Sequence, residues 1–188
     1  MEKYGFYLAG GTAIAIQLKH RQSIDLNWFT PQDIEPDVLS TELQEVGLEI
    51  TDISISTGTL HTRLGVSFME YKYPMIKELI SYDLGFKMAS LVDIGLMKVT
   101  AIADRGTKKD FTDICFIAKK LGGLYRIMES FAKKYEKVNE YHFMKSLTYF
   151  YEADEMPDLE MLIDLNWDEI KKYIRKESLD WEKRNNFY

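Results

Sequence analysis

The spacing of apolar residues changes period along the chain, and its first part alternates like strands. Alternation over residues 24–29 predicts a strand with one apolar and one polar face. The apolar face would carry Ile24, Leu26 and Trp28, and the polar face Asp25 and Asn27. Residues 48–56 and 60–71 alternate on either side of a turn at 57–59, which predicts a hairpin. The short run Tyr4–Leu8 suits a strand or the end of a helix.

Helical spacing dominates the second half. It predicts helices over residues 91–103, 107–121, 124–136, 139–151 and 167–184, with Thr107, Asn139 and Asn166 as N-caps. Two earlier helices are expected at 13–19, after a glycine pair, and at 36–46. A small mixed sheet followed by helices indicates an α+β fold. We expect an α/β core over 1–86 and a helical part over 87–188.

Composition excludes several classes of protein. The 188 residues are 46% hydrophobic and 29% charged, an ordinary globular balance. Cys115 is the lone cysteine, so neither a disulfide framework nor a cysteine zinc cluster is expected, and its apolar neighbours predict a buried position. The three histidines lie far apart, which disfavours a three-histidine metal site. Neither a signal peptide nor a membrane span is expected, which predicts a cytoplasmic protein.

The net charge of −6 is unevenly distributed. Residues 1–97 carry 7 basic and 13 acidic side chains, residues 98–138 carry 10 and 5, and residues 139–188 carry 7 and 12. Overall acidity argues weakly against binding nucleic acid by charge alone, but the basic middle segment removes most of that argument. That segment, which could hold a polyphosphate or an RNA end, contains Lys98, Arg105, Lys108 and Lys109.

Two groups of residues could carry chemistry. In the first, Gly10-Gly11-Thr12 precedes a predicted helix, where free backbone N–H groups favour an anion. The strand that follows places Asp25 and Asn27 on one face, and two side-chain oxygens at that spacing suit Mg²⁺. A glycine pair alone is weak, because most such pairs are turns.

The second group follows Asp93. Lys98 and Arg105 lie two turns apart on one predicted helix, and Asp110 and Asp113 share a face of the next. The two helices could direct several charges to one place. Spacing alone favours solvent-exposed helix faces, with Asp110 as a helix-start carboxylate.

Taken together and in order, these blocks resemble the nucleotidyltransferase AbiEii/AbiGii toxin family. The resemblance rests on Phe6–Ala13, on His20–Leu26, and on the stretch from Asp93 through Lys98 and Arg105-Gly106-Thr107-Lys108-Lys109-Asp110-Phe111 to Asp113. It covers residues 6 to about 121. It implies a nucleotidyltransferase-like fold with a helical C-terminal part. It also implies membership among toxins of type IV toxin–antitoxin and abortive-infection systems.

The resemblance also implies roles for individual residues. Related toxins transfer nucleotides from NTPs to tRNA 3′ ends with Mg²⁺, so Mg²⁺, an NTP and an RNA acceptor are the expected partners, and a cognate antitoxin need not touch the toxin. Asp25 would hold the metal with Asn27, Lys98 would neutralise phosphate charge, and Asp113 would orient Lys98 or act as a base. The expected phosphate-binding residues are Gly10, Gly11, Thr12, Arg21, Ser23 and Arg105.

One departure from the family pattern weakens the prediction of catalysis. The first motif usually reads Asp-x-Asp, and here Asn27 brings an oxygen without negative charge. The strand over 60–71 offers Ser67 and Glu70, and no convincing third carboxylate. A nucleotide-binding or partner-binding pseudoenzyme is therefore the alternative. A helical interaction module around the tyrosine-rich residues 125–151 is compatible with either.

His20, Arg21 and the acidic stretch 152–160 are not expected to act in catalysis, although Arg21 could contact phosphate. His20 is expected to form a hydrogen bond in a turn or helix end rather than to contact phosphate. Arg21 could bind phosphate or pair with Asp25, with no preference between the two. The acidic stretch 152–160 is expected to be a solvated loop.

Overall fold

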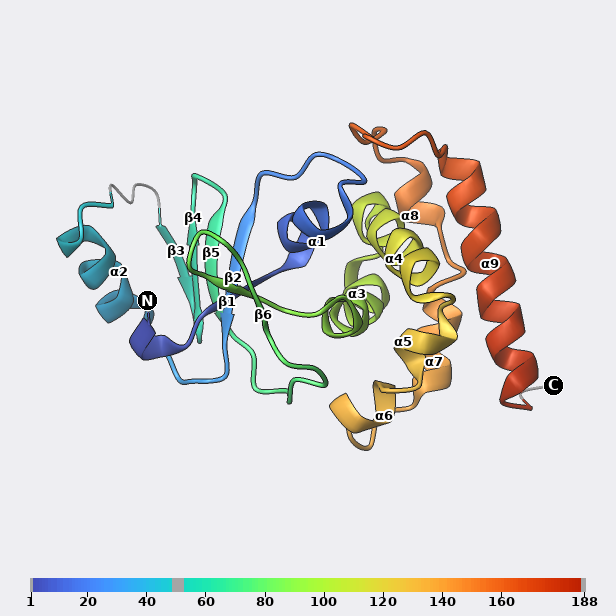
Figure 1. Ribbon diagram of the computed structural model, residues 1–188, viewed down its shortest axis with the longest axis horizontal. Coiled ribbons are helices and arrows are strands. Elements are labelled where there is room, and N and C mark those ends of the chain that lie inside the picture. Colours follow the sequence, from blue (N-terminus) through green and yellow to red (C-terminus); the bar gives the residue numbers. More distant parts are fainter. Residues whose placement is uncertain (1, 49–52, 187–188) are drawn as a thin grey trace.

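The computed structural model describes residues 2–48 and 53–186, which form a mixed sheet joined to a helical region (Figure 1). The sheet order is β3-β4-β5-β2-β1-β7-β6. The strands are β1 Tyr7–Ala9, β2 Leu26–Thr30, β3 Ile53–Ser56, β4 Thr59–Thr62, β5 Val66–Glu70, β6 Ile80–Ser81 and β7 Lys87–Met88. Two strand pairs, β1–β7 and β2–β5, are parallel, and the other pairs are antiparallel. This arrangement confirms the predicted α+β fold.

Four of the described helices begin at a side-chain cap, and the sequence predicts three of these caps. Their bounds are α1 Gly10–Leu18, α2 Pro36–Glu45, α3 Leu91–Arg105, α4 Lys108–Leu121, α5 Tyr125–Met128, α6 Phe131–Lys134, α7 Glu140–Ser146, α8 Tyr151–Asp154 and α9 Trp167–Arg184, after a short 3-10 helix η1 at Glu2–Tyr4. Thr107, Asn139 and Asn166 each accept a backbone N–H, as predicted, and Ser90 does the same for α3. No helix in the described part of the chain is long and apolar enough to cross a membrane.

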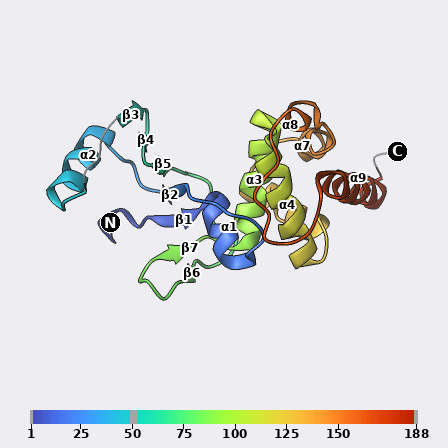
Figure 2. The same cartoon turned by 90° about the horizontal axis from the view of Figure 1, so that it is seen from above.

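Two apolar clusters hold the layers together. The smaller one packs α2 against one face of the outer strands, through Leu39, Leu43, Leu60 and Phe68. The larger one contains residues of β1, α1 and the helices from α3 to α9, with Cys115 buried in it as predicted. α1 contacts β1, α3 and α4, so it links the sheet to the helical region (Figure 2). The predicted division at residues 86 and 87 stays a prediction.

The sheet differs from its prediction in ways that bear on the site. The helix predicted to begin at Ala13 begins at Gly10, so both glycines form its first turn. The strand predicted over 24–29 begins at Leu26, and Ile24 is 87% exposed instead of lying on the apolar face. The described part of the strand predicted over 48–56 is β3, and residues 49–52 lie outside the described residues. The short strands β6 and β7 were not predicted, because two residues show no period.

The prediction of a single strand over 60–71 is wrong, because this range forms the two strands β4 and β5. A turn at Gly65, whose φ of +74° favours glycine, separates β4 from β5. The Gly65 N–H donates to the Thr62 carbonyl at 3.2 Å, and the Thr62 hydroxyl donates to the Val66 carbonyl at 3.0 Å. β5 therefore turns back and lies between β4 and β2.

Two predicted helices are each interrupted. The helix predicted over 124–136 is α5 and α6, separated at Ser130, whose φ of −106° and ψ of 2° are not helical. The helix predicted over 139–151 is α7 and α8. There the hydroxyls of Ser146 and Thr148 donate to the carbonyls of His142 and Lys145, which gives the backbone an alternative to a continuous helix.

Candidate functional site

A cleft with two arms lies where the sheet meets α3 and α4. The first arm is a hollow of about 680 Å³ that extends over Lys108, Lys109 and the loop 156–160, and we call it the basic arm. The second arm is a hollow of about 580 Å³ that extends over His61, Ser67 and Tyr71, and we call it the sheet arm. The residues that line both arms are Gly11, Asp25, Asn27, Lys98 and Arg105, and we call the place where they meet the junction. The cleft thus brings the two groups of sequence motifs together.

The glycine pair lets the helix backbone approach the junction. Gly10 has a φ of +72°, and a Cβ there would lie 2.9 Å from Nδ2 of Asn27. A Cβ on Gly11 would lie 2.6 Å from Nη2 of Arg21. Ala9, at the N-cap of α1, supplies no side-chain cap. The first N–H groups of α1 are therefore open to an anion beside the junction.

Asp25 and Asn27 present free polar atoms to the cleft. Asp25 is exposed and Asn27 is half-buried, and neither side chain makes a hydrogen bond or an ion pair within the described residues. The Thr12 hydroxyl fixes the approach to β2, because it lies 2.6 Å from the Asp25 carbonyl and 3.0 Å from Oγ of Ser23. Thr12 and Ser23 are thus engaged with the protein itself.

Asp113 lies at the centre of a buried ionic network. Its carboxylate, on α4, is fully buried and accepts two parallel hydrogen bonds from Arg21, at 2.8 and 2.9 Å. His20 Nε2 lies 2.8 Å from Oδ1, and Nζ of Lys98 lies 2.7 Å from Oδ2. These four contacts occupy both oxygens of Asp113 and include the one with Lys98, while the catalytic role of Asp113 stays a prediction.

Asp110 extends the network toward the cleft. It accepts from Nζ of Lys98 at 2.8 Å, from Nε of Arg105 at 3.0 Å and from the Thr107 hydroxyl at 2.7 Å. Lys98 is 7% exposed, whereas the Arg105 side chain is 62% exposed. The prediction from spacing that these residues lie on solvent-exposed helix faces is therefore wrong for Lys98, Asp110 and Asp113, since α3 and α4 direct all three inward.

The pKa values of these groups follow from burial and pairing. Burial alone would raise the pKa of Asp113, but the Lys98 charge and the hydrogen bonds from His20 and Arg21 outweigh it and hold that pKa well below its usual range. Burial opposes the charge of Asp110 too, and Lys98 and Arg105 lower its pKa. Burial would lower the pKa of Lys98, and the two carboxylates raise it instead.

Acid is therefore expected to destabilise the protein through this network. Because the pKa values of Asp110 and Asp113 are lower in the folded state, the two carboxylates add stability above their unfolded pKa of about 3.9, and this stability is lost as the pH falls below it. The free energy of unfolding, measured with urea from about pH 6 to about pH 3, should fall more steeply for the wild type than for Asp113→Asn. Equal slopes would contradict this linkage.

The structure places Arg21 and His20 of the N-terminal motif beside Asp113. Arg21 does not pair with Asp25, because its guanidinium binds Asp113 and donates to the Gln22 carbonyl at 2.8 Å. Arg21 also lines the basic arm, and its contact with phosphate stays a prediction. His20 is buried and bound to Asp113, which confirms its structural interpretation.

The acidic stretch 152–160 is mostly exposed and has no helix or strand after α8, which largely confirms the predicted solvated loop. Its first part is α8, and its last part walls the basic arm. The Gln22 N–H donates to the Glu160 carbonyl at 3.0 Å, and the Leu162 N–H donates to the His20 carbonyl at 2.9 Å. Lys108 donates to the Met156 carbonyl and to Asp158, so it is held by the same loop. Of the basic-arm lysines, Lys109 stays exposed.

Sequence reasoning missed His61 as a residue of the site. A single strand over 60–71 would place His61 and Ser67 six residues apart along one strand. The turn at Gly65 instead sets them opposite each other, with Nδ1 of His61 2.7 Å from Oγ of Ser67. The sequence did contain a signal for this hairpin, because Gly65 interrupts the alternation at the Thr62–Val66 turn.

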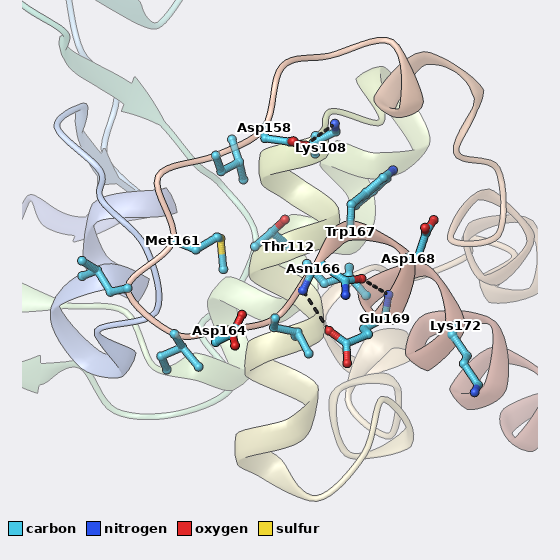
Figure 3. A pocket seen from close by; sticks show the side chains of 15 residues that line it. Lys108, Thr112, Asp158, Met161, Asp164, Asn166, Trp167, Asp168, Glu169 and Lys172 are labelled. Atoms are coloured by element: carbon cyan, nitrogen blue, oxygen red, sulfur yellow. Dashed lines mark hydrogen bonds and ion pairs between the residues drawn. The ribbon is translucent and has the colours of Figure 1, made fainter.

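A third hollow of about 850 Å³ lies on the other side of the loop, between α4 and the start of α9 (Figure 3). Lys108 and Asp158 form an ion pair at 3.1 Å at its rim, and Asn166 and Glu169 form the capping box of α9 inside it. None of the predicted site residues lines this hollow.

Comparisons with known proteins identify a relative and two structures of the same fold. An uncharacterised protein of Aquifex aeolicus (strain VF5) is 37% identical over 177 residues, which are 91% of this chain and 85% of that protein. Two solved structures from Helicobacter pylori share the fold. JHP933 has a TM-score of 0.53 at 18% identity, over 97% of this chain and 87% of that one. A candidate nucleotidyltransferase has a TM-score of 0.56 at 17% identity, over 96% and 87%.

The family model of the nucleotidyl transferase AbiEii toxin of type IV toxin–antitoxin systems matches residues 2–185. This match includes the glycine turn, the strand with Asp25 and the helices with Lys98 and Asp113. The chain therefore belongs to the AbiEii family of nucleotidyl transferase toxins.

Proposed function

We propose that this protein transfers a nucleoside monophosphate from an NTP to a hydroxyl of an acceptor, as the toxin of a toxin–antitoxin or abortive-infection pair. The observation that carries the proposal is the junction, where Asp25, Asn27, Lys98 and Arg105 meet beside the N-terminus of α1. In the reaction the acceptor oxygen bonds to the α-phosphorus, the bond from that phosphorus to the bridging oxygen breaks, and pyrophosphate leaves.

Phosphate charge would be stabilised by groups that the network holds in place. Lys98 has three N–H donors, and Asp110 and Asp113 take two of them. The third remains for an oxygen of the NTP. Arg105 binds Asp110 through Nε and Nη2, and its Nη1 hydrogens can serve a phosphate at the rim. Donors that are fixed before the substrate binds stabilise charge in the transition state more than mobile donors do.

The donors at the junction fit Mg²⁺. This ion is usually held by one or two carboxylates together with substrate phosphates and water. Asp25 supplies one free carboxylate and Asn27 one amide oxygen, and the described residues contain no cluster of three acidic, histidine or cysteine ligands. When bound, Mg²⁺ would neutralise charge on the phosphates and orient them. We therefore expect Mg²⁺ to bind together with the NTP rather than before it.

The acceptor that fits the basic arm is an RNA end, of tRNA or of another RNA. Arg105 and Lys109 lie exposed along it, and Lys108 borders it. The acidic remainder of the chain would repel nucleic acid elsewhere. The basic middle segment does not form one patch, since Lys134 is buried in an ion pair with Asp93 at 2.9 Å.

Transfer can be tested with the purified chain, Mg²⁺, each α-³²P-labelled NTP and total tRNA. We expect label on RNA with at least one NTP, and no label when EDTA is present. Because other RNAs also carry 3′ hydroxyls, total RNA depleted of tRNA forms a second arm of the experiment. Absence of transfer with every NTP and both RNA pools would refute the proposal.

A pseudoenzyme is the second candidate, and Asn27 is the observation that favours it. Replacing Asn27 with Asp adds a second carboxylate at the junction and should raise the affinity for Mg²⁺ in the presence of a non-hydrolysable NTP, by about tenfold. Calorimetry measures this affinity. A pseudoenzyme would bind NTP without turnover, and Asn27→Asp would then create turnover. Unchanged Mg²⁺ affinity would show that residue 27 does not face the metal.

A further inference from the structure

A row of polar side chains crosses the sheet beside the junction. In the strand register Asn27 is opposite Ser67, and Ser67 is opposite His61. These residues occupy β2, β5 and β4, and all three line the sheet arm. Directly opposite residues on neighbouring strands point to the same face, so the row faces the sheet arm. His61 and Ser67 are the two members to which no role is yet assigned.

Most carboxylates of the site are poorly placed to accept the proton of an attacking hydroxyl; the exception is Asp104 on α3, which is exposed and also lines the sheet arm. Asp110 and Asp113 are buried and fully hydrogen-bonded. Glu70, the acid on β5, accepts the Ile34 N–H at 2.8 Å, away from the sheet arm. Asp25 is the proposed metal ligand. Transfer to a hydroxyl nevertheless requires a group that takes this proton.

His61 has the exposure and the orientation that such a group needs. Its ring is exposed, so a proton that it accepts can pass to water. Ser67 is 9% exposed and holds Nδ1 at 2.7 Å. When the Nδ1–H donates to Oγ of Ser67, the lone pair of Nε2 is free for the cleft. A nucleophile, a base and a group that orients the base form the usual arrangement for activating a hydroxyl.

We propose that His61 is the general base of the transfer reaction and that Ser67 is its positioning residue. Nε2 of His61 accepts the proton of the acceptor hydroxyl as its oxygen bonds to the α-phosphorus and pyrophosphate leaves. The imidazolium then returns the proton to solvent. This assignment rests on the proposed function, and it places a neutral base where the sequence has no third carboxylate.

The test compares His61→Gln with the wild type in the labelled-NTP assay. Glutamine keeps a polar side chain but cannot take the proton, so kcat should fall about a hundredfold with little change in KM for the NTP. The dependence of kcat on pH should also differ between the wild type and His61→Gln. The other charged or titratable groups that line the sheet arm are Asp25, Asp104, Tyr71, Lys98 and Arg105, and they are unchanged in this variant.

Ser67 is tested by its own pair of variants. Ser67→Ala should lower kcat about tenfold, as expected when a histidine loses its orienting partner, and Ser67→Thr should restore most of it. His142→Gln is the matched control, because His142 is exposed on α7 and lines neither arm. Its kcat and pH profile should equal those of the wild type. Circular dichroism checks that each variant folds.

The outcomes separate this assignment from the proposed function. If the wild type transfers label and His61→Gln keeps the same kcat and pH profile, the assignment is wrong and the function stands. If His61→Gln loses Mg²⁺ affinity instead of kcat, His61 binds the metal and is not the base. If the wild type transfers nothing, both proposals fail.

Discussion

Replacing Asp113 with alanine is expected to lower the free energy of unfolding by about 3–5 kcal/mol. The substitution leaves Arg21, Lys98 and His20 in a buried space without the carboxylate that binds all three. Removing one member of a buried ionic group is costly because the remaining charges lose their compensation. Urea unfolding followed by circular dichroism measures this loss.

An exposed ion pair provides the control for this prediction. Lys176 and Asp180 lie one turn apart on α9, at 3.7 Å, with side chains 70% and 44% exposed. Lys176→Ala should change the free energy of unfolding by less than about 0.5 kcal/mol. A loss of less than about 1 kcal/mol for Asp113→Ala would show that the buried network relaxes and does not hold α1 and α4 together.

Replacing Asp25 with asparagine is expected to lower kcat/KM for transfer at least about a thousandfold, the upper range for removing a group that stabilises charge in the transition state. Asp25 is the one free carboxylate proposed to hold Mg²⁺, and two neutral amides would remain at the junction. The labelled-NTP assay measures the rate, and calorimetry measures the affinity for Mg²⁺ with a non-hydrolysable NTP.

The stability of Asp25→Asn should stay near that of the wild type, because the Asp25 side chain forms no hydrogen bond or ion pair among the described residues. This contrast with Asp113 separates loss of chemistry from loss of folding. Asp37→Asn, an exposed substitution in the first turn of α2, is the matched control and should keep full activity. A rate within tenfold of the wild type for Asp25→Asn would refute its role as metal ligand.

Local sequence signals predicted much of the fold. The N-caps at Thr107 and Asn166 were found because a side-chain oxygen that satisfies the first helical N–H groups is a local requirement. The turn at Gly65 was missed because alternation continues on both sides of it. The continuity of the helices predicted over 124–136 and 139–151 was also mispredicted, since spacing reports which residues are buried and not whether one helix buries them.

The site was predictable in its parts but not in its contacts. Spacing placed Lys98, Arg105 and Asp113 on suitable helix faces, but the burial of Lys98 and Asp113 depends on how the helices pack, including α1 against α4. The pairing of Arg21 with Asp113 joins residues 92 positions apart, and no local pattern encodes it. The pairing of His61 with Ser67 depends on the hairpin register for the same reason.

The loop that walls the basic arm is among the last parts of the chain that the ribosome makes. The hydrogen bond between the Gln22 N–H and the Glu160 carbonyl holds this loop against the cleft. At about 5–20 residues per second, the ribosome makes Glu160 on the order of ten seconds after Gln22. The buried Asp113 network also waits for α4. A nascent chain or an early-terminated fragment therefore carries the glycine turn and Asp25 without a closed cleft, and the producing cell meets a complete site only when nearly the whole chain has been translated.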